Sequence, residues 1–173
     1  IGSGKGTFLV QHAPLHPEVP FRGIEDAAAI ARHAADRFRR HNLSNARMLH
    51  AEAGLIVRRY LPDQCMQQVH IYFPDPWPKK RHHKRRLVQA PFLEQVHRIL
   101  RPGGCVRLAT DHADYFQWME EHAANVSHLF DRQPFERPES AGEGELVGTN
   151  FERKYRDEGR TFNGMVLVKK DEV

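Results

Sequence analysis

The chain has 173 residues, 40% of them hydrophobic and 28% charged, and its 26 Lys and Arg against 22 Asp and Glu leave a net charge of +4. These values predict one globular domain, spanning residues 1–173, with a single core. No apolar run approaches the roughly 20 residues that cross a bilayer, and Cys65 and Cys105 match no disulfide framework, so a reducing cytoplasm is expected. The chain opens with Ile1 and no Met, which indicates that a natural N-terminal segment is missing.

Strand and helix patterns alternate along the first part of the chain. Ile1 is expected to end a strand, and a glycine-rich turn at 2–6 leads into a helix near Thr7. A strand is predicted at 21–25, and Asp26 is typical of an N-cap for the helix after it. That helix is predicted from apolar residues at helical spacing, namely Ala27, Ile30, Ala31, Ala34 and Phe38. A strand at 46–51 and a helix at 54–60 follow.

The alternation continues in the second part. A strand at 69–73 ends at Pro74, and a helix with Pro91 in its first turn is stopped by the glycines at 101–104. The remaining predicted elements are a strand at 105–110, a helix at 111–124 and strands at 129–134 and 161–169. The segment 136–148, rich in Glu, Gly, Pro and Ser, is predicted to be a mobile loop. This order predicts an α/β fold whose mostly parallel sheet binds ligands at the carboxyl ends of its strands.

Two features near the N-terminus suggest a nucleoside-containing cofactor. The glycines of Gly2-Ser3-Gly4-Lys5-Gly6 let the backbone approach a ligand closely, although many α/β turns are rich in glycine. Glu25 ends the next predicted strand and can accept hydrogen bonds from both hydroxyls of a ribose. Its alternative role is an exposed acid beside a helix N-terminus. These features leave a nicotinamide and S-adenosylmethionine both open.

The segment after the strand at 69–73 is the most distinctive. Pro74, Pro76 and Pro78 stiffen the chain around Asp75 and Trp77. Residues 79–86 then bring six Lys or Arg and two His, which form either a solvated face or a patch that contacts phosphates. The twelve histidines are scattered and lack zinc spacing, so no metal is predicted.

This segment resembles the signature of the bacterial tRNA (guanine-N7-)-methyltransferases. The likeness runs from Phe73 through the basic run to Leu87 and continues at 100–104, at Thr110-Asp111 and at 149–153, so it covers the chain in order. It implies the class I methyltransferase version of the doubly wound, Rossmann-like sheet, mostly parallel with one antiparallel strand near an edge. It also implies transfer of a methyl group from S-adenosylmethionine to N7 of a guanosine in the variable loop of tRNA, at tRNA position 46.

The resemblance also implies roles for individual residues. Asp75 is expected to be catalytic and to lie where cofactor and guanine meet. The expected cofactor-binding residues are Gly2, Gly4, Glu25, Glu52 and Asp75, and the expected substrate-binding residues are Lys79, Asp111, Thr149, Asn150, Phe151 and Glu152. Glu152 could accept hydrogen bonds from N1 and N2 of guanine, or it could form a salt bridge that anchors the final strand. Trp77 could stack on the base or pack in the core.

The chain departs from the family pattern at one place and is silent at another. The family usually has Asp-Ala where this chain has Glu52-Ala53, and it places an acid directly before Ile1. Two alternatives remain: a class I methyltransferase that acts on an amino nitrogen of DNA or protein, and an RNA-binding module with a degenerate cofactor site. The expected partner is tRNA, with no membrane and no metal, and the expected assembly is a monomer or a homodimer.

Overall fold

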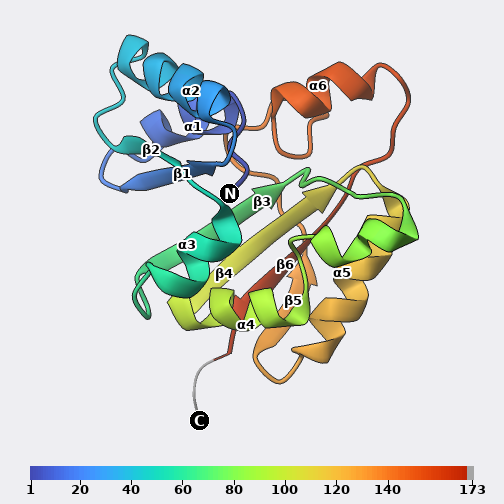
Figure 1. Ribbon diagram of the computed structural model, residues 1–173. Helices are drawn as coiled ribbons and strands as arrows, with labels where there is room; N and C mark the ends of the chain where they lie inside the picture. Colours follow the sequence, from blue (N-terminus) through green and yellow to red (C-terminus); the bar gives the residue numbers. More distant parts are fainter. Residues whose placement is uncertain (171–173) are drawn as a thin grey trace. The chain divides into compact units, whose positions relative to one another are not determined.

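The computed structural model describes residues 1–170. These residues form two compact units, Ile1–Ala53 with Arg137–Arg160, and Gly54–Glu136 with the chain from Thr161 onward (Figure 1). Each unit has its own hydrogen-bonded sheet. That the units make up one functional domain stays a prediction. Within the described part of the chain, no helix combines the length and the apolarity needed to cross a membrane.

The first unit is built on a two-stranded parallel sheet. β1 (Phe21–Glu25) pairs with β2 (Ala46–His50), and α2 (Ala28–Arg40) packs on both strands. The other elements of the unit are α1 (Thr7–His12), the short 3-10 helix η1 (Ala13–Leu15) and α6 (Asn150–Arg156). The buried core of this unit is formed by Leu9, Ala13, Phe38 and Ala46.

The apolar spacing predicted α2 correctly, but its cap was wrong. Ala31, Ala34 and Phe38 are buried as expected for the inner stripe of an amphipathic helix. The N-cap is Ala27 rather than Asp26, and no side chain caps the helix in the usual way. The Glu25 carboxylate accepts a hydrogen bond from the Ala27 amide at 3.1 Å, so the preceding strand supplies the acceptor for this helix start.

The second unit contains a four-stranded sheet in the order β3-β4-β6-β5. β3 (Met66–Tyr72) pairs in parallel with β4 (Leu100–Thr110), whereas β6 (Asn163–Lys169) runs antiparallel to both β4 and β5 (Phe130–Pro134). The predicted antiparallel strand near an edge is therefore β6. It is confirmed by the register of both its pairings.

Helices cover this sheet and close its core. α3 (Ala53–Arg59) precedes β3, the 3-10 helix η2 (Lys80–Arg85) follows it, and α4 (Ala90–Ile99) and α5 (Ala113–Asn125) pack against each other and against β4 (Figure 1). Every second residue at the end of β4 points into the core, as expected for a strand covered by helices. The largest fully buried apolar side chains include Ile71, Leu93, Ile99, Leu100, Leu108, Tyr115, Met119, Met165 and Leu167.

Three predictions about elements were wrong. Ile1 belongs to no strand. Residues 101–104 do not form a break after the helix, because β4 starts directly at Leu100 and pairs with β3 from there. The helix α6 was missed, because 149–153 was expected to lead straight into the final strand.

Candidate active site

The glycine-rich turn of the first unit has the backbone that only glycine adopts easily. Gly2, Gly4 and Gly6 have φ angles of +64°, +51° and +73°. A Cβ at Gly2 or Gly4 would meet no atom within 4 Å, whereas a Cβ at Gly6 would lie 2.7 Å from the Phe38 ring. The first two glycines therefore leave open backbone toward a ligand. Gly6 instead allows the turn to pack closely on α2.

Glu25 links this turn to the start of α2. One carboxylate oxygen accepts from the Gly4 amide at 2.9 Å, and the other accepts from the Ala27 amide at 3.1 Å. A carboxylate has about four acceptor positions, so each oxygen keeps one for a further donor. The side chain is half-buried and held from two sides, which fixes the direction of the remaining positions. Glu25 is thus oriented as a ribose-binding acid needs to be.

Glu52 lies at the same end of the two-stranded sheet as Glu25. The register pairs Glu25 with His50, the last residue of β2, and the Ala51 amide donates to the Glu25 carbonyl at 3.0 Å. Glu52 follows directly, is exposed, and precedes α3. The carboxyl ends of β1 and β2 therefore present two acids, together with the turn of Gly2 and Gly4, on one unit.

In the second unit, the carboxyl ends of β3 and β4 bring two further acids together. Tyr72 pairs with Ala109, and the Phe73 amide donates to the Ala109 carbonyl at 2.8 Å. Asp75 follows β3 and is exposed, and Asp111 follows β4 and is half-buried. Because parallel strands end at the same edge, both predicted residues lie at the edge where α/β sheets bind ligands.

The backbone around Asp75 is strained. Phe73 and Trp77 have φ angles of +53° and +43°, which bulky residues rarely adopt, and each precedes a proline. Such residues cost on the order of 1–3 kcal/mol each and persist only where their surroundings hold them. Trp77 is half-buried, with its ring under the Arg85 guanidinium at 4.9 Å and against His82 at 5.9 Å. It is therefore neither a core residue nor a fully exposed platform.

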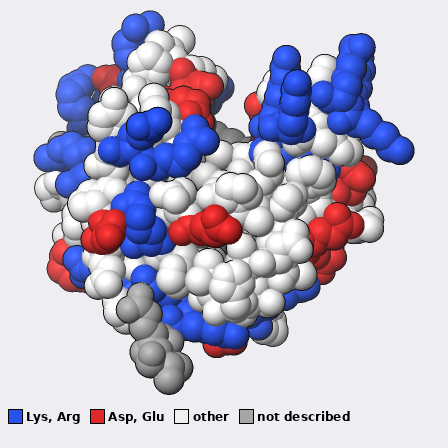
Figure 2. Space-filling view, turned by 60° about the horizontal axis from the view of Figure 1, so that its bottom comes forward, with Lys and Arg blue, Asp and Glu red and all other residues white. Residues whose placement is uncertain are grey.

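The basic run forms η2 and is mostly exposed. Lys79 is the N-cap of this 3-10 helix, and the exposed members of the run are Lys79, Lys80, Arg81, Lys84 and Arg85. Figure 2 shows that Lys and Arg side chains stand out from the surface in separate groups, with Asp and Glu between them. Positive charge is therefore concentrated locally rather than spread over the face. Arg86 differs from the rest of the run because only 1% of it is exposed.

The late segment forms the N-terminus of α6. Thr149 is the N-cap, and its hydroxyl accepts from the Glu152 amide at 3.1 Å. Asn150 is exposed, and Phe151 is 37% exposed with its ring 4.6 Å from that of Tyr155. The spacing Thr149-x-x-Glu152 is the signature of a capping box, a signal in the sequence that would have predicted this helix.

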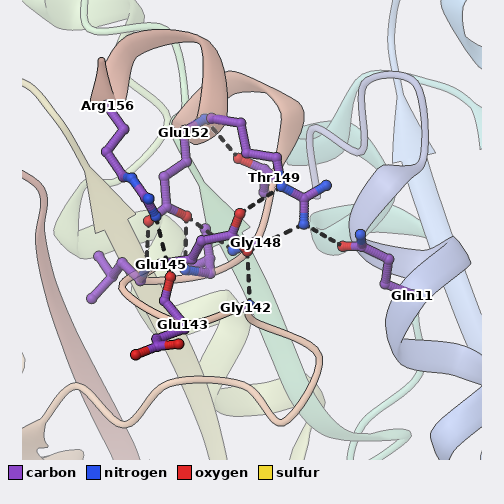
Figure 3. A network of polar contacts seen from close by, with 11 residues as sticks. Gln11, Gly142, Glu143, Glu145, Gly148, Thr149, Glu152 and Arg156 are labelled. Carbon is purple, nitrogen blue, oxygen red and sulfur yellow. Dashed lines mark hydrogen bonds and ion pairs between the residues drawn. The ribbon is translucent and has the colours of Figure 1, made fainter. Parts of the chain in front are cut away.

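Glu152 is one of the most buried charged residues, with 1% of it exposed. Its carboxylate accepts from the amides of Val147 and Gly148, both at 2.9 Å, and makes a short contact with the amide of Leu146 (Figure 3). In a regular capping box the acid binds the amide of the N-cap residue itself, whereas here it binds the three amides before it. Most of its acceptor capacity is thus used to hold the backbone that enters α6.

A second acid connects the same backbone to α1. Glu145 accepts from the Gly142 amide at 2.8 Å and pairs with Arg153 at 2.6 Å, and Arg153 reaches the Gln11 side chain at 3.4 Å (Figure 3). The Arg153 side chain lowers the pKa of the Glu145 carboxyl below its ordinary value. Segment 136–148 has no helix or strand, as predicted, but the expectation that it has little to bury was wrong, because Val147 is fully buried. Its mobility stays a prediction.

The solved structures that resemble this chain are methyltransferase-like α/β proteins. Precorrin-6y C5,15-methyltransferase from Geobacter metallireducens matches with a TM-score of 0.62 and 15% identity, over 99% of this chain and 78% of that one. The fold and the acids at its strand ends therefore define a protein of the class I methyltransferase fold. The described residues contain no group of three or more His, Cys, Asp or Glu side chains that could hold a metal ion.

Sequence comparison is more specific. Residues 1–164 match the family model Methyltransf_4, described as "Putative methyltransferase". A tRNA (guanine-N(7)-)-methyltransferase from Nitrosococcus oceani is 37% identical over 92% of this chain and 65% of its own length, and one from Nitrosomonas eutropha is 35% identical over 98% of this chain and 74% of its own length. This chain belongs to the tRNA (guanine-N7-)-methyltransferase family. It spans about two thirds to three quarters of the length of these two relatives.

Proposed function

We propose that this chain transfers a methyl group from S-adenosylmethionine to N7 of a guanosine in the variable loop of tRNA, at tRNA position 46. The observation that carries the proposal is Asp75, an exposed acid on a strained, proline-framed loop that continues into the exposed basic helix η2. Family membership supports the same reaction, because the curated relatives are named for it. We expect the enzyme to act in the cytoplasm as a monomer or a homodimer.

The residues of the first unit fit the cofactor. Gly2 and Gly4 have open backbone where a Cβ would meet nothing, and Glu25 keeps acceptor positions for ribose hydroxyls. Glu52 is proposed to face the adenine amino group, as an acceptor one methylene longer than the family's usual Asp. When bound, S-adenosylmethionine supplies the methyl carbon, made electrophilic by the adjacent sulfonium.

The proposed role of Asp75 follows from the chemistry of guanine. N7 has a lone pair on the major-groove edge and needs no deprotonation before it attacks, so no strong general base is required. The purine gains positive charge as the methyl group arrives, and a fixed carboxylate can stabilise that charge. Lys79 and Asp111 are proposed to contact the substrate, and the exposed basic side chains after Lys79 to contact its phosphates.

The late segment is proposed to serve the substrate in two ways. Thr149, Asn150 and Phe151 lie at the N-terminus of α6, where Phe151 offers an exposed ring for stacking. Glu152 contributes by holding the backbone that enters this helix, because its carboxylate is buried on three amides. Direct pairing of Glu152 with guanine would require it to give up some of those bonds.

The test is to incubate the protein with unmodified bulk tRNA and labelled S-adenosylmethionine, and to map the modified nucleotide by mass spectrometry. We expect N7-methylguanosine at tRNA position 46, and loss of at least 100-fold in turnover for Asp75→Ala with the fold retained. Methylation of DNA or protein instead, or tRNA binding without uptake of S-adenosylhomocysteine in calorimetry, would support one of the two alternatives. Wild-type turnover in Asp75→Ala would contradict the role of that carboxylate.

A further inference from the structure

Arg86 is the last residue of the basic run and the only fully buried one among its members. Its Nε donates to the Pro76 carbonyl at 2.8 Å, and its Nη2 pairs with the Asp114 carboxylate. Its guanidinium also lies over the rings of Tyr115 and Trp118, at 4.9 and 5.2 Å from their centroids. A guanidinium with all these partners and 1% exposure has no surface left for a phosphate.

The carbonyl that Arg86 binds lies in the middle of the strained loop. Pro76 stands between Asp75 and Trp77, and the prolines at 74, 76 and 78 have no amide that could anchor the loop. Phe73 and Trp77, at the two ends, are in the left-handed region and need support from their surroundings. A backbone carbonyl is therefore one of the few handles by which this loop can be fixed from outside.

The first turns of α5 hold Arg86 in place. Asp114, Tyr115 and Trp118 all come from this helix. The same helix also fixes the residue two positions after Arg86, because the Tyr115 hydroxyl accepts from the Val88 amide at 3.2 Å and Trp118 Nε1 donates to the Val88 carbonyl at 2.8 Å. Arg86 thus connects a packed helix to the loop that carries Asp75.

We infer that Arg86 is a positioning residue, which fixes the Asp75 loop through the Pro76 carbonyl and does not contact RNA. The inference rests on the proposed role of Asp75 in methyl transfer. An arginine suits this position because its planar fork presents Nε and Nη2 in fixed directions to two separate acceptors. A lysine keeps the charge but cannot reach the Pro76 carbonyl and Asp114 with that geometry.

The experiment compares Arg86→Lys, which keeps the charge, with Arg86→Met, which removes it. The matched control is Arg59→Lys, the same change at an exposed arginine of α3 in the same unit. Three quantities are measured: hydrogen exchange of the 73–80 segment without substrate, the single-turnover rate at saturating tRNA, and the slope of log K for tRNA against log salt. A purely structural residue far from the site would leave the first two unchanged in the folded protein.

For Arg86→Lys we expect at least fivefold faster exchange at 73–80 and at least a tenfold lower single-turnover rate, with affinity for S-adenosylhomocysteine within about twofold. Neither Arg86 variant should change the salt slope, and Arg59→Lys should match the wild type throughout. A slope lowered by about 0.7–0.9 in Arg86→Met would identify a phosphate contact and overturn the inference. Normal exchange and rate in Arg86→Lys would overturn it as well.

The exchange measurement separates this inference from the proposed function. If the wild-type protein failed to methylate tRNA, the proposed function would fail, but faster exchange at 73–80 would still show that Arg86 holds the loop. If Arg86→Met did not fold, Arg86→Lys would decide alone through exchange and rate. A wild-type exchange pattern in Arg86→Lys would in every case remove the positioning role.

Discussion

Asp75 and Glu152 carry the same charge in opposite surroundings. Asp75 is exposed on a loop, whereas Glu152 is 1% exposed and accepts from three backbone amides. A buried carboxylate bound to several N–H groups loses much of its free energy of interaction when one oxygen is replaced by a donor. The two acids should therefore respond to neutralisation in different ways, one through catalysis and the other through stability.

For Glu152→Gln we expect the free energy of unfolding to fall by about 1–3 kcal/mol, because the new NH2 group faces backbone donors. Chemical denaturation measures this directly. The control is Glu143→Gln, an exposed acid of the same loop, which should leave stability unchanged. Unchanged stability in Glu152→Gln, together with a tenfold loss of kcat/KM on tRNA, would instead place the carboxylate on the guanine base.

The Glu145–Arg153 pair makes stability depend on pH. Arg153 lowers the pKa of Glu145 in the folded protein, so the unfolded chain binds a proton at this position more readily. The stabilisation is complete above the ordinary Glu pKa of about 4.3 and is lost as pH falls through the lower, folded value. We expect Glu145→Gln to unfold at lower denaturant concentration than the wild type at pH 7 and to show a shallower loss of stability below about pH 4.3. Parallel curves for the two proteins would show that the pair contributes nothing.

At the scale of elements, short pieces of structure carry most of the proposed site. η2 has six residues and α6 has seven, and neither buries an apolar stripe. Each is held by contacts at its ends, with Arg86 at the end of η2 and Glu152 before α6. Such elements can present charges and rings outward because burial does not determine their sequence.

The basic helix η2 should set the salt dependence of tRNA binding. Each lost phosphate contact lowers the slope of log K against log salt by about 0.7–0.9, so changing Lys80, Arg81, Lys84 and Arg85 together to Gln should lower it by about 3. Binding isotherms at several salt concentrations give the slope. Changing the exposed Arg58 and Arg59 of α3 to Gln is the control for general charge. An unchanged slope in the fourfold variant would mean that the run is only a solvated face.

The glycine turn permits a matched pair of substitutions. Gly2→Ala and Gly6→Ala both place a Cβ at positive φ, but only the Cβ at Gly6 meets the Phe38 ring, at 2.7 Å. We expect Gly6→Ala to lower the melting temperature by several degrees more than Gly2→Ala. Gly2→Ala should chiefly weaken binding of S-adenosylhomocysteine, which calorimetry measures. Equal melting temperatures would mean that Phe38 moves aside without cost.

At the scale of the whole molecule, the sequence predicted the order of elements better than the contacts at the site. β1 and β2 were predicted to within one residue because their ends carry strong turn signals, and α2 because its apolar residues recur at helical spacing. Glu152 could not be assigned its partners, because they are backbone amides and every residue type has one. The burial of Arg86 was equally hidden, since it depends on α5, which begins almost thirty residues later.

The sheet order β3-β4-β6-β5 has a consequence for how the chain is made. β6 is the last strand in the sequence, yet it lies inside the sheet and is the sole strand pairing with β5. On the ribosome, β4 must therefore wait with one edge open until the end of the chain emerges, and open edges of this kind invite pairing with other chains. A chain that stops at residue 160 should lack a cooperative unfolding transition and should aggregate. A peptide covering 161–173, added in trans during refolding, should restore solubility by filling the vacant place between β4 and β5.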